Sequence, residues 1–211
     1  MFISFEGIDK SGKSTQISLL VDYLKQKGYE VVQTCEPGGT RSGEKIERIL
    51  LEPSTEEISG ISELFLYLAD RAEHVEKIIK PALEKGKIVI SDRFADATIA
   101  YQGHGRELDI PWIEELNKRV THGLSPDITF LLDISPDLAQ KRSGSEGKDR
   151  IENEKISFHQ KVRQGYLKFA KKHTERIKVI NGEGSVEEIQ LIIRKILAKH
   201  LRRKKLCPLK I

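Results

Sequence analysis

The sequence predicts an α/β protein in which a parallel sheet of about five strands carries helices on both faces. Strand-like and helix-like segments alternate from one end of the chain to the other. The third strand candidate, residues 87–91, is nearly all apolar, as a strand buried on both faces should be. The 211 residues are enough for one domain with its own hydrophobic core.

The expected strands are short apolar runs bounded by polar or glycine-containing segments. They fall at residues 2–5, 29–34, 87–91, 128–133 and 177–180. In parallel sheets of this kind, ligands bind beyond the carboxyl ends of the strands. The polar motifs described below follow such strands, so we expect one functional site at that edge of the sheet.

The expected helices have apolar side chains three and four residues apart, as at Ile17, Leu20 and Leu24. Gly28 is expected to end the first helix, and Pro81, which lacks an N–H, to bend or restart the longest one. The helices fall at residues 13–27, 44–51, 59–85, 94–102, 111–121, 136–142, 152–173 and 186–201.

The composition excludes several classes of protein. Apolar residues make up 38% and charged residues 32% of the chain, which is typical of a globular rather than a disordered protein. The apolar runs are far too short to cross a bilayer, so no membrane partner is expected. The chain opens directly into a strand-like run, and Cys35 and Cys207 form neither a CxxC nor a metal-ligand spacing. These features favour a cytoplasmic, reducing location.

The net charge of +4 is unevenly placed. Residues 199–211 hold six basic residues and no acidic residue, so the rest of the chain is slightly acidic. We therefore expect one domain over residues 1–198 and a basic tail over residues 199–211. A solvated tail is the simpler interpretation, and a nucleic-acid partner is not expected.

A phosphate-binding loop follows the first expected strand. Residues 7–14 match G-x-x-x-x-G-K-[ST] between a strand and a helix, which is the context that such a loop requires. Its backbone N–H groups and the helix N-terminus can hold a triphosphate, Lys13 supplies a charge for the outer phosphates, and Ser14 can bind Mg²⁺. The nucleotide-binding residues are expected to be Gly7, Ile8, Asp9, Lys10, Ser11, Gly12, Lys13, Ser14 and Thr15.

Asp9 and Lys10 are informative beyond the motif. An acid in a loop built for anions is expected to face something other than phosphate, such as a hydroxyl group. Lys10 places a second cation near the same site. The alternative for both side chains is exposure to solvent.

An acceptor site is indicated by motifs after the second and third strands. These motifs are residues 36–40, 92–94 and 100–103. Tyr67 and Arg71 lie four residues apart and therefore share one helix face. An aromatic ring can stack on a base, and guanidinium groups can clamp a phosphate. The alternative for Tyr67 is packing in the core, and the alternative for Arg71 is an exposed position on the helix surface.

Basic residues flank a polar, glycine-containing stretch after the fourth strand. Lys141, Arg142, Lys148 and Arg150 surround residues 143–147. We expect a mobile lid over residues 142–150 that excludes water and neutralises charge on a transferring phosphoryl group. An ordinary charged surface loop is the alternative.

Two other nucleotide-binding classes fit less well. A GTPase switch needs N-K-x-D, but Asn117-Lys118 is followed by Arg119-Val120, and the segment after Asp92 has no glycine for a D-x-x-G turn. A nucleic-acid-binding ATPase is disfavoured by the short chain and by an aromatic content of 6%.

Together, these residues resemble the thymidylate kinases, a family of P-loop nucleoside monophosphate kinases. The matching segments, in chain order, are FEGIDKSGKST, EPGGT, LFLYLADRAEHV, SDRF, AYQGHGRELD, LLDISP and DRIE. The resemblance runs from Phe2 to about Leu197. It implies a three-layer P-loop fold with a flexible lid, a homodimer, and transfer of the γ-phosphoryl group of ATP to dTMP with Mg²⁺, giving dTDP and ADP for dTTP synthesis. Another P-loop kinase of nucleotides or small molecules is the alternative.

The resemblance also implies roles for single residues around dTMP. Asp9 would bind the 3′-hydroxyl and Arg93 the phosphate, and Tyr101 would crowd C2′ and disfavour ribose. The residues near thymine would be Tyr67, where the family usually has Phe, Arg71 and Gln102.

For phosphoryl transfer, the resemblance implies that Ser14, Glu36 and Asp92 position Mg²⁺, partly through water. The family places its catalytic cation either in the phosphate loop or in the lid, whereas this chain has cations in both. The catalytic candidates are Lys13, Lys10, Arg93, Arg142 and Arg150. The chain departs from the family at Cys35, where Arg is common, and at Ala97, where Ser is usual.

Overall fold

A five-stranded parallel sheet forms the centre of the molecule in the computed structural model, which describes residues 1–53, 57–144 and 149–203. The strand order is β2-β3-β1-β4-β5, so β1 lies in the middle, and Ile3 pairs with Ile90 on one side and with Ile128 on the other. The predicted parallel sheet of about five strands is confirmed. The strands are β1 (Phe2–Glu6), β2 (Val31–Cys35), β3 (Ile88–Asp92), β4 (Ile128–Asp133) and β5 (Ile177–Asn181).

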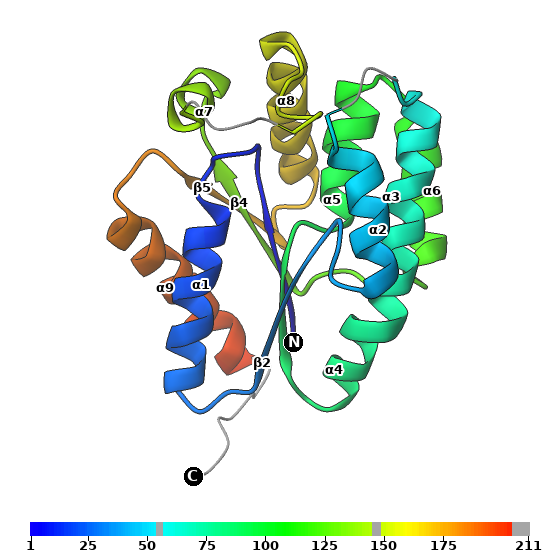
Figure 1. Cartoon of the computed structure of the whole chain (residues 1–211). Coiled ribbons are helices and arrows are strands. Elements are labelled where there is room, and N and C mark those ends of the chain that lie inside the picture. Colours follow the sequence, from blue (N-terminus) through cyan, green and yellow to red (C-terminus); the bar gives the residue numbers. More distant parts are fainter. Residues whose placement is uncertain (54–56, 145–148, 204–211) are drawn as a thin grey trace.

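Helices cover both faces of the sheet, which gives the three layers (Figure 1). One face carries α1 (Lys13–Gln26) and α9 (Val186–Arg203). The other helices are α2 (Arg41–Leu51), α3 (Gly60–His74), α4 (Lys80–Glu84), α5 (Ala95–Thr98), α6 (Ile110–Val120), α7 (Pro136–Arg142) and α8 (Ile156–Lys172), with π-helical segments η1 (Val75–Ile79) and η2 (Ile99–Gly105).

The main hydrophobic core lies between the sheet and the α1–α9 layer. Fully buried side chains of the central strands, such as Phe5 and Phe130, pack against Leu20 of α1 and Ile193 of α9. Burying such side chains is the main stabilising contribution. It fixes the ends of β1, β3 and β4, and with them the loops that follow.

Two predicted helix starts are wrong because side chains cap the chain elsewhere. The helix predicted from residue 44 begins at Arg41, since Thr40 Oγ1 accepts the Gly43 N–H at 2.9 Å. The helix predicted from residue 152 begins only at Ile156, because Asp149 holds the preceding residues in a turn by accepting the Glu152 N–H at 2.7 Å.

The longest predicted helix is divided into α3, η1 and α4. Pro81 is the second residue of α4 and directly follows the π-helical segment η1, so the predicted bend or restart falls at this proline. The predicted loop over residues 103–109 is shorter than expected, since η2 continues through Gly105.

Helix α9 runs five residues into the predicted basic tail, to Arg203. Residues 204–211 lie outside the described part of the chain, as do lid residues 145–148. In the part that is described, no helix is long and apolar enough to span a membrane.

Candidate active site

Two adjoining hollows lie beyond the carboxyl ends of the strands. The larger, of about 460 Å³, is lined by phosphate-loop residues and by Asp92 and Arg142, and we call it the donor cleft. The smaller, of about 80 Å³, is called the acceptor cavity, and its lining includes Tyr67, Arg71, Tyr101 and Gln102. The two hollows share a wall made by Asp9, Glu36, Pro37, Leu51 and Arg93.

The phosphate loop has the backbone geometry that its glycines permit. Gly7 has φ of 136°, and a Cβ atom there would lie 2.4 Å from the Leu132 carbonyl oxygen, so only glycine fits. The N-cap of α1 is Gly12, whose backbone lies in the left-handed region, and no side-chain cap is formed there within the described chain. The first N–H groups of this helix are therefore available to an anion.

Lys13 is buried in this loop and curls back over it. Its Nζ atom donates to the carbonyl oxygens of Gly7 at 3.3 Å and Ile8 at 3.2 Å. Burial, and then the nearby charge of Arg93, lower the pKa of Lys13. Because no carboxylate pairs directly with the ammonium among the described residues, a phosphate can take that place.

Ser14 and Asp92 form the oxygen pair predicted for Mg²⁺. Ser14 Oγ donates to Asp92 Oδ2 at 3.1 Å, and the buried Asp92 Oδ1 has no hydrogen-bond partner among the described residues. An unsatisfied carboxylate oxygen beside a hydroxyl suits a hard cation that takes its other ligands from phosphate and water. In the described chain, no three His, Cys, Asp or Glu side chains form a complete metal site.

Glu36 faces Arg71 rather than this oxygen pair. Its Oε2 accepts from Arg71 Nε and its Oε1 bonds His74 Nδ1, both at 2.8 Å. Each carboxylate oxygen of Glu36 thus bonds one side chain of α3, which positions Arg71. Glu36 also lines the donor cleft, and its part in positioning Mg²⁺ through water stays a prediction.

Arg71 is only 1% exposed, so the alternative of a surface arginine is wrong. Besides Glu36, its guanidinium donates to Thr98 Oγ1, Asn117 Oδ1 and the Phe94 carbonyl oxygen. Among the described residues, four of its five N–H groups thus have protein acceptors. The charge is held rigidly at the acceptor cavity, in line with the predicted position near the base.

Asp9, Arg93 and Tyr101 meet at the shared wall. Arg93 Nη2 forms an ion pair with Asp9 Oδ1 and donates to the Tyr101 hydroxyl at 3.1 Å, which in turn donates to Asp9 Oδ2 at 3.0 Å. Burial would raise the pKa of Asp9, but Arg93, Lys13 and these hydrogen bonds outweigh it and hold the pKa well below its usual range. Asp9 is therefore an ionised acceptor suited to a hydroxyl group.

Tyr67 and Gln102 complete the acceptor cavity. Tyr67 is half-buried and lines the cavity, which supports stacking over core packing. Gln102 is 1% exposed, and its Nε2 donates to Glu63 Oε1 at 2.9 Å.

The structure separates the two predicted lid arginines. Arg142 lines the donor cleft and donates to the carbonyl oxygens of Lys10 at 3.3 Å and Gly182 at 3.1 Å. Arg150 instead donates to the Leu50 carbonyl oxygen at 2.7 Å and to Glu63 Oε2 at 2.6 Å. A buried carboxylate on α3 thus holds Arg150, and its role as a lid cation in phosphoryl transfer stays a prediction.

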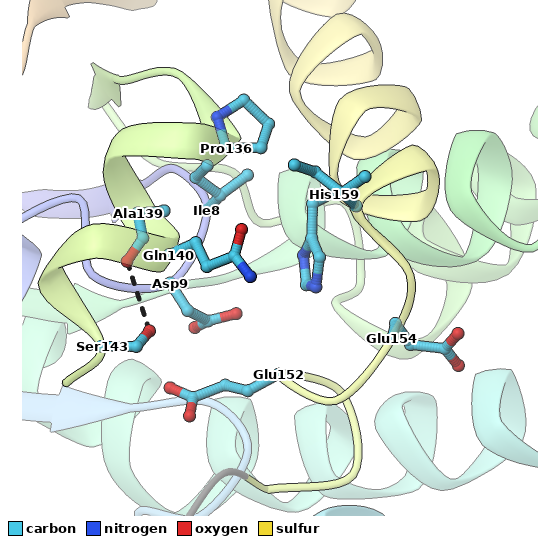
Figure 2. Close-up of a pocket in the computed structure, with 10 residues that line it drawn as sticks. Ile8, Asp9, Pro136, Ala139, Gln140, Ser143, Glu152, Glu154 and His159 are labelled. Carbon is cyan, nitrogen blue, oxygen red and sulfur yellow. Dashed lines mark hydrogen bonds between the residues drawn. The ribbon is translucent and has the colours of Figure 1, made fainter. Parts of the chain in front are cut away.

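Lys10 also has a partner beyond the phosphate loop. Its Nζ lies 3.3 Å from Glu152 Oε1, in the segment that follows the lid. Figure 2 shows Glu152 and Asp9 at a further small cavity of about 70 Å³ between α7 and α8. Arg142, at the start of the lid, and Glu152, just after it, thus both contact Lys10 of the phosphate loop.

The sequence model of a family described as thymidylate kinase matches residues 5–193. The chain belongs to the thymidylate kinase family.

Relatives named thymidylate kinase match nearly the whole chain. The protein of Exiguobacterium sp. is 50% identical over 191 residues, covering 90% of each chain. The protein of Symbiobacterium thermophilum is 46% identical over 204 residues, covering 97% of this chain and 95% of its own. The crystal structure of thymidylate kinase from Ehrlichia chaffeensis superposes with a TM-score of 0.75 at 39% identity, covering 93% of this chain and 98% of that one.

Both departures from the thymidylate kinase pattern lie in the walls of the site. Cys35, where Arg is common, lines the donor cleft, with Sγ 3.6 Å from the Pro37 carbonyl oxygen. Ala97, where Ser is usual, lines the acceptor cavity. Neither substitution disrupts the contacts of Arg71, Arg93 or Asp9.

Sequence reasoning missed two buried acids that support this thymidylate kinase site. Glu6 accepts the Phe94 N–H and the Tyr166 hydroxyl, both at 2.8 Å, and Tyr166 in turn accepts from Arg93. Glu63 is fully buried and bonds Gln102. Two features of the sequence could have revealed these acids. Glu6 ends an otherwise apolar strand, and Glu63 lies four residues before Tyr67 on the same helix face.

Proposed function

We infer that the enzyme transfers the γ-phosphoryl group of ATP to dTMP, giving dTDP and ADP. The observation that carries this inference is the wall shared by the donor cleft and the acceptor cavity. A triphosphate on the phosphate loop and a monophosphate at Arg93 would meet there, in line with family membership.

Catalysis in this arrangement is positioning and charge neutralisation. A phosphate oxygen of dTMP is already nucleophilic at neutral pH, so no general base is required. Lys13 and Arg142 border the donor cleft, and Arg93 borders both hollows. These cations are placed to offset negative charge that spreads over the transferring group.

Mg²⁺ is the cofactor that this chemistry requires, and Ser14 and Asp92 would hold it. The ion neutralises phosphate charge when bound. The Ser14 hydroxyl and the unpartnered Asp92 Oδ1 are the two protein oxygens that fit it.

On the acceptor side, the ionised Asp9 would bind the 3′-hydroxyl group of dTMP. The Tyr101 ring is fixed by edge contacts with Phe158 and Tyr166 and by its bond to Asp9, so it can exclude a 2′-hydroxyl group. Tyr67 would stack on the base, and Arg71 and Gln102 would bind its polar edge.

We also propose that the enzyme is a cytoplasmic homodimer. Three large apolar side chains are exposed together on α3 and α6, namely Ile61, Phe65 and Trp112, and the last two pack edge to face. A second copy of the chain would cover this surface. Light scattering of the wild-type protein should give twice the 24.0 kDa chain mass. The Trp112→Arg variant should shift the measured mass toward that of a single chain.

The function is tested with a panel of acceptors. The protein is mixed with Mg²⁺ and ATP and with each of dTMP, dUMP, AMP, GMP, CMP and shikimate, and ADP release is followed. Fastest turnover with dTMP is expected. Preference for another acceptor would assign the protein to the other P-loop kinases, and ATP hydrolysis that no acceptor accelerates would indicate an ATPase or a switch.

A further inference from the structure

Glu63 is a buried carboxylate with no part in the reaction described so far. It lies on α3, is fully buried, and accepts hydrogen bonds from three side chains. Gln102 Nε2 lies at 2.9 Å, Arg106 Nη2 at 3.0 Å and Arg150 Nη2 at 2.6 Å. Burial alone would raise the pKa of Glu63, but the bonds from Arg106, Gln102 and Arg150 outweigh it and lower the pKa. The group is therefore ionised and can only accept hydrogen bonds.

An ionised Glu63 determines which way the amide of Gln102 faces. The amide has one accepting and one donating end, and the donating Nε2 must face the carboxylate. The reverse orientation would place Gln102 Oε1 against a buried negative charge without a hydrogen bond, which is costly. Gln102 lines the acceptor cavity, so its Oε1 is the end left for a ligand.

Arg71 provides the complementary donor in the same cavity. In the described chain, its four protein acceptors leave one N–H group, on Nη2, without a bond. Gln102 and Arg71 together thus offer the cavity one acceptor and one donor. Thymine carries N3–H beside the O4 carbonyl, which matches this pair, whereas cytosine has an accepting N3 beside a donating amino group and matches neither.

We propose that Glu63 is a positioning residue that sets the base preference of the enzyme. By holding the Gln102 amide with Oε1 toward the acceptor cavity, it favours a pyrimidine that carries N3–H and disfavours cytosine. This inference rests on the proposed function, and in particular on Gln102 lying at the base edge. Arg106 and Arg150 support it by keeping Glu63 charged.

The decisive variant is Glu63→Gln, assayed with dTMP and dCMP. The new amide can turn its own N–H₂ toward Gln102, which then presents Nε2 to the cavity. The ratio of kcat/KM for dTMP to that for dCMP should fall by about 10- to 100-fold, mainly through a higher KM for dTMP. Equal losses with both nucleotides would show that Glu63 is only structural and would overturn the proposal.

Glu154→Gln is the matched control. Glu154 pairs with Arg106 Nη1 but does not contact Gln102. It tests whether weakening the arginine cluster alone changes base preference. The dTMP to dCMP ratio should stay at the wild-type value, and a fall equal to that of Glu63→Gln would overturn the proposal.

Gln102→Leu keeps the question testable if Glu63→Gln does not fold. This change removes the acceptor while leaving Glu63 with both arginines, so the ratio should fall by a similar factor. A fall in Gln102→Leu with no change in a folded Glu63→Gln protein would retain Gln102 as a base contact and overturn the role of Glu63. An unchanged ratio in both variants would overturn the proposed placement of Gln102 itself.

Discussion

Lys13 is the side chain whose loss should cost the most activity. Its ammonium is held by two backbone carbonyl oxygens over the phosphate loop, ready for the outer phosphates. Lys13→Ala should lower kcat by about 10³- to 10⁵-fold, with ADP release as the measurement. Lys10→Ala is the comparison, and its smaller expected loss reflects the ion pair with Glu152. If Lys13→Ala kept more than about a tenth of wild-type turnover, Lys13 would have no central role in transfer.

Tyr101 should contribute sugar selectivity through its ring and not through its hydroxyl group. Tyr101→Ala should relax the preference for dTMP over ribo-TMP, because the fixed ring no longer crowds the 2′ position. Tyr101→Phe keeps the ring and loses only the bonds to Asp9 and Arg93, so the preference should remain while KM rises. Steady-state kinetics with both nucleotides measure this, and an undiminished preference in Tyr101→Ala would refute the steric role.

The sequence could predict which residues gather at the site but not all of their partners. Lys13, Ser14, Asp92 and Arg93 follow neighbouring parallel strands, so the topology alone brings them together. The partners of Glu36 come from α3, whose position over the sheet is a tertiary feature without a local pattern. This is why the sequence did not reveal the ion pair between Glu36 and Arg71.

At the level of elements, segment types were predictable and helix ends were less so. The type of a segment is encoded by the spacing of its apolar residues, which is repeated over many positions. Both β4 and α7 begin and end as predicted. The start of α8 depends on a single contact of Asp149 with a backbone N–H, and such contacts compete with helix formation.

The two ends of the lid should differ in function. Arg142→Ala should lower kcat by about 10- to 100-fold, because this arginine borders the donor cleft. Arg150→Ala should mainly raise the KM for dTMP, because Arg150 bonds Glu63 on the acceptor side. Separate titrations of ATP and dTMP distinguish these effects. A larger loss of kcat in Arg150→Ala than in Arg142→Ala would contradict this assignment.

At the level of the whole molecule, the sheet was predictable and its strand order was not. Alternating strands and helices require a parallel sheet. Placing β1 between β3 and β4 depends on which faces of the strands and helices pack best together, and this packing has no local sequence pattern.

Stability should respond to pH through Asp70. Burial, and then the nearby charge of Glu36, raise the pKa of Asp70 to about 7, whereas an unfolded Asp ionises near pH ~4. Between these values only the folded protein holds the proton, so the free energy of unfolding falls as pH rises through this window. Asp70→Asn keeps an acceptor for the Gly38 N–H and cannot ionise. The free energy of unfolding of Asp70→Asn should be close to that of the wild type at pH ~5 and should exceed it by about 2 kcal/mol at pH ~8.

Urea denaturation at the two pH values measures this difference, with exposed Asp22→Asn as the matched control. A constant difference between Asp70→Asn and wild type across the pH range would show that Asp70 does not titrate in the folded state.

Cys35 gives the donor cleft a built-in chemical reporter. Its thiol lines the cleft, where burial and then the charge of Glu47 raise its pKa to about 11. Alkylation by iodoacetamide should therefore be slow at neutral pH, since the thiolate is the reactive form. A nucleotide that fills the cleft should slow the labelling further, so peptide mass spectrometry could follow occupancy without any engineered probe.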